Sequence, residues 1–277
     1  MENDKVIHSS PRVSIAVGIY NCAGTLGEAL KSILKQAYGD WELILCDDGS
    51  TDDTLSIAKS YAARDTRIRV VRNLKNLGLN HSLNHCLREA RGEFYARMDG
   101  DDISAPDRLM KLVAALDANP EVSLVSSWMT CFDEVGEWGL VKTKASPTRA
   151  DFIYGTPFCH APCMVRTSVM RELSGYGTES WLRRSQDYHL WFRLYAAGHR
   201  GINLQEPLYR MRNSREATSR RSLRTRLMEA RIMWFGFRLL RIAPWHYIRI
   251  LRPILLGIMP SWLYEHLHRW KRSHSAK

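Results

Sequence analysis

Short apolar runs alternate with segments of helical spacing through the first half of the chain. The runs suit buried strands at residues 13–19, 41–46, 68–72 and 94–98. Between them, apolar residues recur every three or four positions, which predicts helices at residues 25–36, 51–64 and 79–90. Strands that alternate with helices in this way predict an α/β fold with a mainly parallel central sheet flanked by helices.

The second half has a looser order. We expect, in sequence, a helix, a strand, a hairpin, an extended segment and a helix at residues 106–119, 122–126, 130–144, 157–166 and 185–197. From residue 214 onward, apolar positions follow three- and four-residue steps among arginines, with a predicted stripe formed by Leu223, Leu227, Ala230, Trp234 and Phe237. A second segment of this kind spans residues 244–270. The chain therefore divides into an α/β domain (1–213) and a basic, aromatic-rich, amphipathic helical extension (214–277).

The net charge of +11 lies entirely in this extension. Residues 1–213 hold 26 Lys and Arg against 26 Asp and Glu, whereas residues 214–277 hold 14 against 3. Arginines beside tryptophans suit an anionic membrane surface; the alternative is that the stripe packs on the α/β domain and the arginines face solvent. Nucleic acid is the rival partner of a basic segment. Because the sequence has no helix-turn-helix, zinc-finger or RNA-binding motif, we expect no nucleic-acid binding.

Several features bear on location. The first residues lack the basic and then apolar pattern of a secretory signal. The uncharged stretch 253–264 is too short for a helix that crosses a hydrocarbon core of about 30 Å. No two of the six cysteines have Cys-x-x-Cys spacing, so we interpret them as free thiols of a reducing compartment. We expect a cytoplasmic protein, peripheral on the inner face of the cell membrane.

An acidic cluster follows the fourth predicted strand. Asp99, Asp101 and Asp102 stand within four residues and repel one another. A divalent cation offsets such repulsion, and Mg²⁺ or Mn²⁺ prefers oxygen ligands that it shares with substrate phosphates. The alternative is a solvated acidic loop before the helix that begins near Pro106. The sequence has no phosphate-binding loop of the Gly-x-x-x-x-Gly-Lys-Ser/Thr type.

Two further polar groups follow the first and second strands. Gly18, Tyr20 and Asn21 end the first, and Asp47 and Asp48 end the second. Ligands of open α/β sheets bind at the carboxyl ends of the strands, so these residues can meet one nucleotide. The alternative is that they form ordinary polar turns and helix caps.

Asp187 stands at the start of the helix predicted at residues 185–197. A carboxylate there complements the helix dipole. The functional alternative is a general base.

In this order and spacing, these motifs resemble family-2 inverting glycosyltransferases with the GT-A fold. The resemblance covers residues 11–212. It is carried by the opening strand that ends in Tyr20-Asn21, the run Asp47-Asp48-Gly49-Ser50-Thr51-Asp52-Asp53-Thr54, the turn Asn76-Leu77-Gly78, the Asp99-x-Asp101-Asp102 motif with Pro106, and the segment Gln186-Asp187-Tyr188. It implies a Rossmann-like sheet that binds a nucleoside-diphosphate sugar.

The resemblance also implies roles for single residues. Tyr20 and Asp48 hold the base, most often uracil, with Asp47 in support. Asp99 binds the ribose side of the donor. Asp101 is the principal ligand of a divalent cation, Mg²⁺ or Mn²⁺, with Asp102 beside it.

The same resemblance makes Asp187 the catalytic base that deprotonates the acceptor hydroxyl. The acceptor is then a glycan or a polyprenyl-diphosphate-linked sugar of cell-surface polysaccharide synthesis, and UDP is the expected donor nucleotide. A nucleotidyltransferase is the rival enzyme, but it normally carries a Gly- and Lys/Arg-rich loop after the first strand, which residues 18–22 do not form.

The chain departs from the family pattern at three positions. Gly18 stands where relatives commonly carry Pro-Thr, and Gln186 replaces a Glu. Arg212 occupies the place of a frequent His, so Arg212 or Arg210 is expected to pair with the donor diphosphate. His160 matches a common His and is expected near the acceptor.

Overall fold

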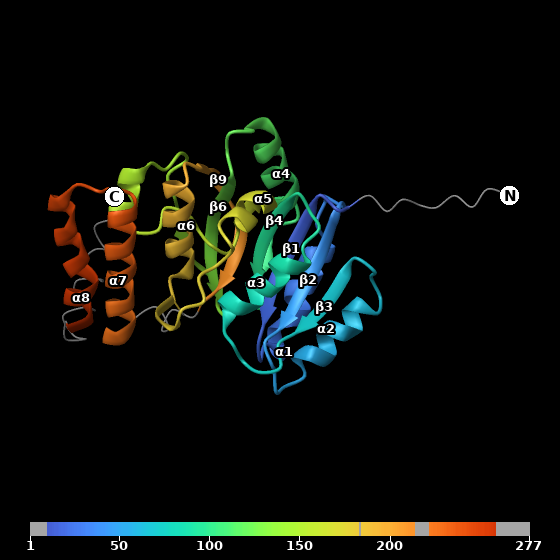
Figure 1. The fold of residues 1–277 in the computed structure, drawn as a ribbon. Coiled ribbons are helices and arrows are strands. Elements are labelled where there is room, and N and C mark those ends of the chain that lie inside the picture. Colours follow the sequence, from blue (N-terminus) through green and yellow to red (C-terminus); the bar gives the residue numbers. More distant parts are fainter. Residues whose placement is uncertain (1–9, 183, 214–221, 259–277) are drawn as a thin grey trace.

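The computed structural model describes residues 10–182, 184–213 and 222–258. Four parallel strands lie in the order β3-β2-β1-β4 (Figure 1). They are β1 (Val13–Ile19), β2 (Trp41–Asp47), β3 (Ile68–Arg72) and β4 (Phe94–Asp99). The helices that connect them are α1 (Ala23–Leu34), α2 (Thr54–Ala62) and α3 (Leu79–Glu89). All of these elements confirm the sequence predictions to within a few residues.

Mixed pairing extends the sheet through β8, β6, β9 and β5. Strand β8 (Met164–Arg166) runs antiparallel to both β4 and β6 (Leu124–Asp133), and β6 is parallel to β9 (Gly201–Arg212). Two further antiparallel pairs join β5 (Ile103–Ser104) to β9 and β7 (Gly136–Val141) to β6. The sheet is therefore parallel in its first half and mixed in its second.

The remaining described elements of the α/β domain are three helices and two short 3₁₀ turns. The helices are α4 (Arg108–Ala118), α5 (Thr167–Glu172) and α6 (Gln186–Ala196), with 3₁₀ turns η1 (Arg149–Ile153) and η2 (Ser180–Leu182). The predicted extended segment 157–166 is a strand only over its last three residues. Neither β9 nor α5 was predicted.

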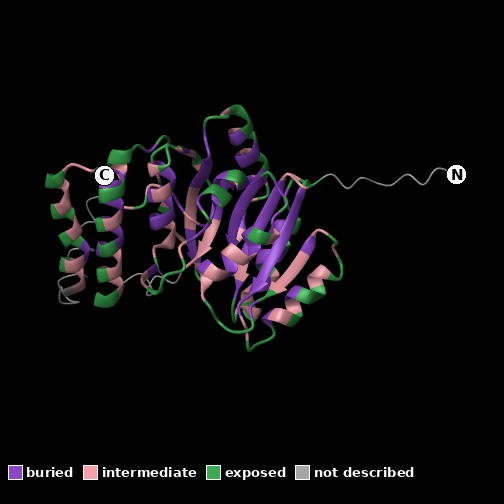
Figure 2. Ribbon diagram, in the orientation of Figure 1, coloured by how far each residue is buried: buried purple, intermediate pink, exposed green. Residues whose placement is uncertain are grey.

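Two apolar clusters fill the two faces of the sheet, and the buried residues line its strands (Figure 2). Alternate residues of β1, such as Val13 and Ile15, join the cluster beneath α1 and α4. Ala16 points the other way, into the cluster formed with α3 and α6. This alternation follows from the two-residue period of a strand and fixes which residues face each helical layer.

The basic extension continues the fold as a helical layer. Helix α7 (Leu223–Leu239) packs on α6, and a 3₁₀ turn, η4 (Pro244–Ile250), leads to α8 (Leu251–Ile258) beside α7 (Figure 1). In the predicted apolar stripe, Ala230 and Phe237 are buried, but Leu223, Leu227 and Trp234 are 43%, 49% and 51% exposed. The predicted buried stripe is thus confirmed only in part, and α7 also buries Ile232, Met233 and Gly236. Residues 259–270 of the second predicted segment lie outside the described residues.

The described helices give no candidate for a bilayer span, since none is both long and apolar enough.

Gly236 sets how closely α7 approaches α6. A β-carbon at this position would lie 2.2 Å from the ring of Phe192. We expect Gly236→Ala to lower the free energy of unfolding by about 1–3 kcal/mol, the usual cost of overpacking. Gly24→Ala in α1 is the matched control, because no atom lies within 4 Å of its added carbon and Ala favours a helix. Thermal denaturation of both variants tests this, and equal melting temperatures would contradict the packing.

Candidate active site

The carboxyl ends of three parallel strands meet at one edge of the sheet. In the register of β1, Ile19 faces Asp47 of β2, and Gly18 lies between Cys46 of β2 and Asp99 of β4. The loops that leave β1, β2 and β4 therefore start side by side. This is the edge at which the sequence predicted a nucleotide site.

Asp48 organises the turn that precedes α3. One oxygen accepts hydrogen bonds from Asn73 Nδ2 at 2.8 Å and from the Leu77 amide at 3.1 Å, and the other accepts from the Gly78 amide at 2.7 Å. The carboxylate is buried. Asp47 is also buried, where it accepts from the Ser50 amide and pairs with Arg72 Nε at 3.2 Å. Both carboxylates thus have structural partners, and their contact with a base stays a prediction.

The loop after β1 is tied to the loop after β2 through Asn21. This residue has a positive φ of 47° and accepts a hydrogen bond from the Thr51 amide at 2.9 Å, while its own amide donates to Ser50 Oγ. Tyr20 is 46% exposed beside it, as a side chain that is to cover a base requires. A β-carbon on Gly18 would lie 2.8 Å from Leu79 Cδ1, so glycine here allows close packing of α3. Donor contacts by Gly18, Tyr20 and Asn21 stay predictions.

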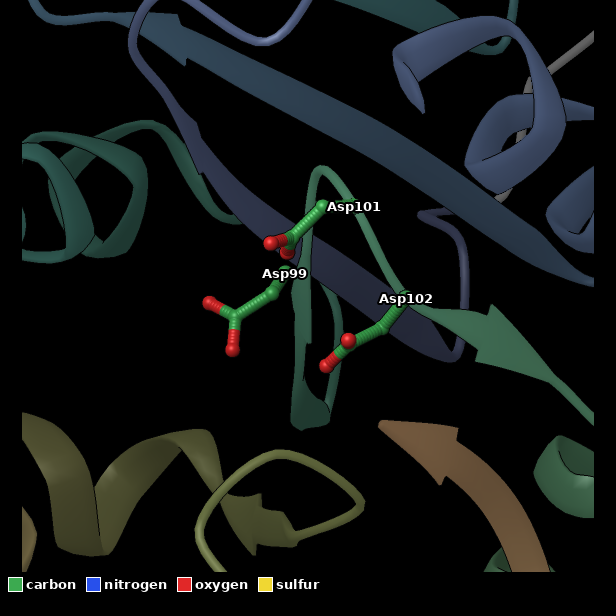
Figure 3. Close-up of side chains that lie close together, drawn as sticks. All are labelled: Asp99, Asp101 and Asp102. Carbon is green, nitrogen blue, oxygen red and sulfur yellow. The ribbon is translucent and has the colours of Figure 1, made fainter. Parts of the chain in front are cut away.

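The acidic cluster forms a compact set of oxygen ligands. The carboxylates of Asp99, Asp101 and Asp102 each offer an atom within 4.8 Å of the others. They point to the same side of the loop between β4 and β5 (Figure 3). Asp101 is exposed, Asp99 is half-buried and Asp102 is buried. An exposed member gives substrate access, while the buried member fixes the loop.

In the part of the chain that the structure describes, the buried carboxylate of Asp102 lacks an ion-pair partner of the kind that a bound cation would supply. Its Oδ1 accepts from the Arg212 amide at 2.7 Å, but its buried Oδ2 has no hydrogen-bond partner among the described residues. Burial, together with repulsion from Asp99 and Asp101, raises the pKa of Asp102 to about 7. Burial and Asp99 likewise raise the pKa of Asp101. The residues present therefore fit a hard divalent cation, which would supply the missing positive charge.

Two buried arginines, absent from the sequence predictions, lie behind the cluster. Arg97 of β4 forms an ion pair with Asp99. Burial alone would lower the pKa of Arg97, but Asp99 raises it. Fully buried Arg108 donates to the Arg97 carbonyl at 3.0 Å, with its guanidinium 5.3 Å from the ring centre of Tyr209. A charged residue inside the apolar run 94–98 was the signal that could have identified Arg97.

The end of β9 holds the acidic loop from the other side. Arg212 donates through Nε to the Asp101 carbonyl at 3.0 Å and pairs with Glu28 at 2.5 Å. Arg210 pairs with Glu137 at 2.9 Å, and both guanidinium groups lie over the ring of Phe132. Arg212 thus lies at the predicted cation site, whereas Arg210 pairs away from the acidic loop. Contact of either residue with a diphosphate stays a prediction.

Asp187 lies in the first turn of α6, half-buried. Burial raises the pKa of the Tyr176 hydroxyl, and the charges of Asp187 and Asp99 raise it further. His160 shares a 2.9 Å hydrogen bond with the Tyr176 hydroxyl, and its ring meets Trp191 edge-on. Burial and nearby Arg97 lower the pKa of His160, which is therefore neutral. The role of Asp187 stays a prediction.

Comparison with known proteins decides the family. A model of the family described as "Glycosyl transferase family 2" matches residues 14–174. The chain belongs to glycosyl transferase family 2. It is 43% identical over 264 residues to the EpsE protein of Bacillus subtilis (strain 168), whose name places it provisionally among glycosyltransferases, with 95% of each chain covered.

A second relative of this family 2 glycosyltransferase is the Escherichia coli protein named UDP-Gal:alpha-D-GlcNAc-diphosphoundecaprenol beta-1,3-galactosyltransferase. The two are 28% identical over 261 residues, which cover 91% of this chain and 93% of the relative. Both alignments run beyond the family match, to nearly the full length of each chain.

Solved structures show the same fold. S. aureus TarS 1-349 in complex with UDP superposes with a TM-score of 0.68 at 22% identity, covering 88% of this glycosyltransferase and 70% of the TarS 1-349 chain. The mannosyltransferase PcManGT of Pyrobaculum calidifontis, solved with GDP-Man and Mn²⁺, gives a TM-score of 0.64 at 21% identity, covering 98% and 82%. The predicted GT-A architecture is therefore confirmed.

The buried acid makes the stability of this glycosyltransferase depend on pH. In the unfolded chain Asp102 has a pKa near 3.8, against about 7 in the fold. Between these values the folded protein holds a proton that the unfolded chain has lost, so stability falls as pH rises and stays lowered above pH 7.

Without divalent cations, Asp102→Asn is therefore expected to raise the melting temperature by several degrees at about pH 8. The amide oxygen can still accept from Arg212, and the gain should vanish near pH 4. A lower melting temperature of the variant at pH 8 would show that the charge of Asp102 is stabilised by the fold alone.

Proposed function

We propose that this glycosyltransferase moves a sugar, with inversion, from a UDP-sugar to a hydroxyl group of a lipid-linked glycan in cell-surface polysaccharide synthesis. The observation that carries the proposal is the cluster of three carboxylates beside the nucleotide edge, with one buried oxygen that lacks a partner. The name of the Escherichia coli relative, with its UDP-sugar donor and diphosphoundecaprenol acceptor, supports the choice of both substrates. The UDP in TarS supports the nucleotide.

The donor is held, in this proposal, by the residues at the ends of β1, β2 and β4. Tyr20 covers the base and Asp48 accepts its ring N–H, while Asp99 accepts from the ribose. Asp101 and Asp102 would hold Mg²⁺ or Mn²⁺, which would supply positive charge for the departing diphosphate. Arg212, already fixed by Asp101 and Glu28, adds a positive charge beside that leaving group.

The acceptor hydroxyl loses its proton to Asp187 as its oxygen attacks the anomeric carbon from the face opposite the diphosphate. One such displacement inverts the anomeric configuration and requires no covalent intermediate. Tyr176 and His160 are held together by a hydrogen bond, and both are neutral because burial shifts their pKa values. We assign this region to the acceptor.

The helical extension, residues 214–277, places the enzyme on the inner face of the cell membrane in this proposal. Arg224, Arg231 and Arg238 are exposed on α7, next to exposed Trp234. Each arginine near an anionic surface contributes about 1 kcal/mol of attraction. A peripheral position brings the active site to a lipid-linked acceptor.

Product analysis tests the enzymatic part of the proposal. The protein, a panel of nucleotide sugars, Mn²⁺ and an undecaprenyl-diphosphate-linked acceptor should yield free UDP and an extended lipid-linked glycan with an inverted linkage. Release of pyrophosphate would instead identify a nucleotidyltransferase. Retention of the anomeric configuration would contradict the single displacement.

A further inference from the structure

A small basic cavity lies between the α/β domain and the helical extension. It has a volume of about 100 Å³, and its lining includes Tyr154, Arg226, Glu229, Arg249, Arg252 and Leu256. Arg226 and Glu229 come from α7, and Arg249, Arg252 and Leu256 from η4 and α8. At about 30 Å³ per water molecule, this space suits a group of a few heavy atoms. None of the lining residues belongs to the proposed sugar-transfer site.

The cavity has an excess of positive charge. Among the residues that the structure describes, three arginines line it against the single carboxylate of Glu229. Arg226 lies 3.5 Å from Glu229, with its side chain only 12% exposed, and its buried Nε has no hydrogen-bond partner among the described residues. Arg249 lies over the ring of Tyr154 at 4.8 Å. Within the described parts of the chain, neither Arg249 nor Arg252 has a carboxylate within ion-pair distance.

Exposed apolar side chains lie on the same elements as the cavity residues Arg249 and Arg252. Ile248, Leu251 and Leu255 are 67%, 47% and 56% exposed. Their steps of three and four residues place them along one side of the η4–α8 segment. Exposed Trp245 and Tyr154, at 73% and 60%, extend the apolar surface. A row of arginines beside a row of exposed apolar groups matches the boundary between lipid headgroups and acyl chains.

We propose that this cavity binds the headgroup phosphate of an anionic phospholipid in the bilayer, while Ile248, Leu251 and Leu255 enter the interface beside it. Guanidinium groups suit phosphate because their N–H donors match its oxygens in pairs. This lipid-phosphate site depends on the membrane association proposed above. It gives that association a defined binding position in place of a diffuse basic surface.

Vesicle binding by the full chain tests the site. Vesicles of phosphatidylcholine with phosphatidylglycerol are compared with phosphatidylcholine alone for the wild type and for Arg249→Gln/Arg252→Gln. Loss of two phosphate-binding arginines is expected to weaken binding to the anionic vesicles by about 10- to 30-fold. Arg64→Gln/Arg88→Gln is the matched control, because it removes the same charge from exposed positions of the α/β domain that neither line the cavity nor belong to the basic extension.

The outcomes separate a phosphate site from general attraction. Arg249→Lys/Arg252→Lys keeps the charge but not the paired donors, so it should bind less tightly than the wild type and more tightly than the double Gln variant. Equal losses in the cavity and control variants would overturn the site. Protection of the wild type by inorganic phosphate in thermal denaturation, with no preference for anionic vesicles, would overturn the lipid assignment.

UDP titration of the same variants shows whether a loss of vesicle binding is independent of the proposed sugar-transfer site. Nucleotide binding should be unchanged in all three variants, because no cavity residue contacts the acidic cluster. If the wild type bound vesicles as expected but bound no UDP-sugar, the sugar-transfer proposal would fail while the phosphate site would stand.

Discussion

Replacing Asp187 with asparagine is expected to lower turnover by about 10²–10⁴-fold, the usual contribution of a general base. Asparagine has nearly the same shape but cannot take the proton of the acceptor hydroxyl. Donor binding should be nearly unchanged, because the proposed donor contacts come from β1, β2 and β4, whereas Asp187 belongs to α6. The measurement is the turnover number and the KM for the UDP-sugar at saturating acceptor, together with UDP affinity by calorimetry.

The stability of the Asp187→Asn variant distinguishes a catalytic role of Asp187 from a purely structural one. A first-turn acid stabilises a helix by about 0.3–1 kcal/mol through the helix dipole. If Asp187 served only the dipole, the variant would lose stability of that size and keep its turnover. Gln186→Ala is a matched control in the same turn, and its turnover should stay within a few-fold of the wild type. Full activity of Asp187→Asn would remove Asp187 from the mechanism.

The first half of the sheet could be predicted because its signals are local. β1, β2 and β4 are mainly apolar runs with single polar residues such as Ser14, Glu42 and Arg97, and a parallel strand that is buried on both faces requires such a run. Glycine or acidic residues bound the runs of β2 and β4, so the predicted ends of these strands were close to the observed ones. The carboxyl ends of parallel strands share one edge by topology, which is why Asp47 and Asp99 could be placed together from sequence.

Strand β9 was missed because tertiary pairing overrides its sequence. Gln205, Glu206 and Pro207 interrupt the apolar pattern, and the ladder with β6 shifts register at Trp128, opposite Pro207. Nothing local marks such an irregularity. The buried face of α7 was predicted only in part for a related reason. Close packing against Phe192 of α6 buries Gly236, and a glycine gives no hydrophobic signal in the sequence.

The residues that support the site differ in how clearly the sequence indicates them. Arg97 could have been singled out as a charge within a buried strand, since such a charge needs a partner. Tyr176 and Tyr209 had no such signal, because a buried tyrosine is common in any core. Tyr209 reaches the site only through its hydroxyl, which accepts a hydrogen bond from the Asp99 amide at 3.0 Å. Their placement depends on how the second half of the sheet folds back on β4.

The Asp101→Ala variant is expected to lose nucleotide binding that depends on Mn²⁺. Asp101 is the exposed member of the cluster, so it is the carboxylate that a cation and a diphosphate can reach together. Removing it should weaken UDP affinity in Mn²⁺ by about 10²-fold or more, because a bound cation contributes several kcal/mol of charge stabilisation. Calorimetric UDP titrations with Mn²⁺ and with a chelator measure the difference.

A second acid at the same edge of the sheet serves as the control for Asp101→Ala. Asp53 lies before α2 and makes no side-chain capping hydrogen bond, so Asp53→Ala removes an equal charge outside the cluster and should leave the titration unchanged. Loss of Asp101 also relieves repulsion from Asp99, so the cation-free variant should be at least as stable as the wild type. Weaker UDP binding can then be attributed to the lost ligand, since an unfolded variant would show a lower melting temperature. An unchanged UDP titration of Asp101→Ala in Mn²⁺ would refute the cation site.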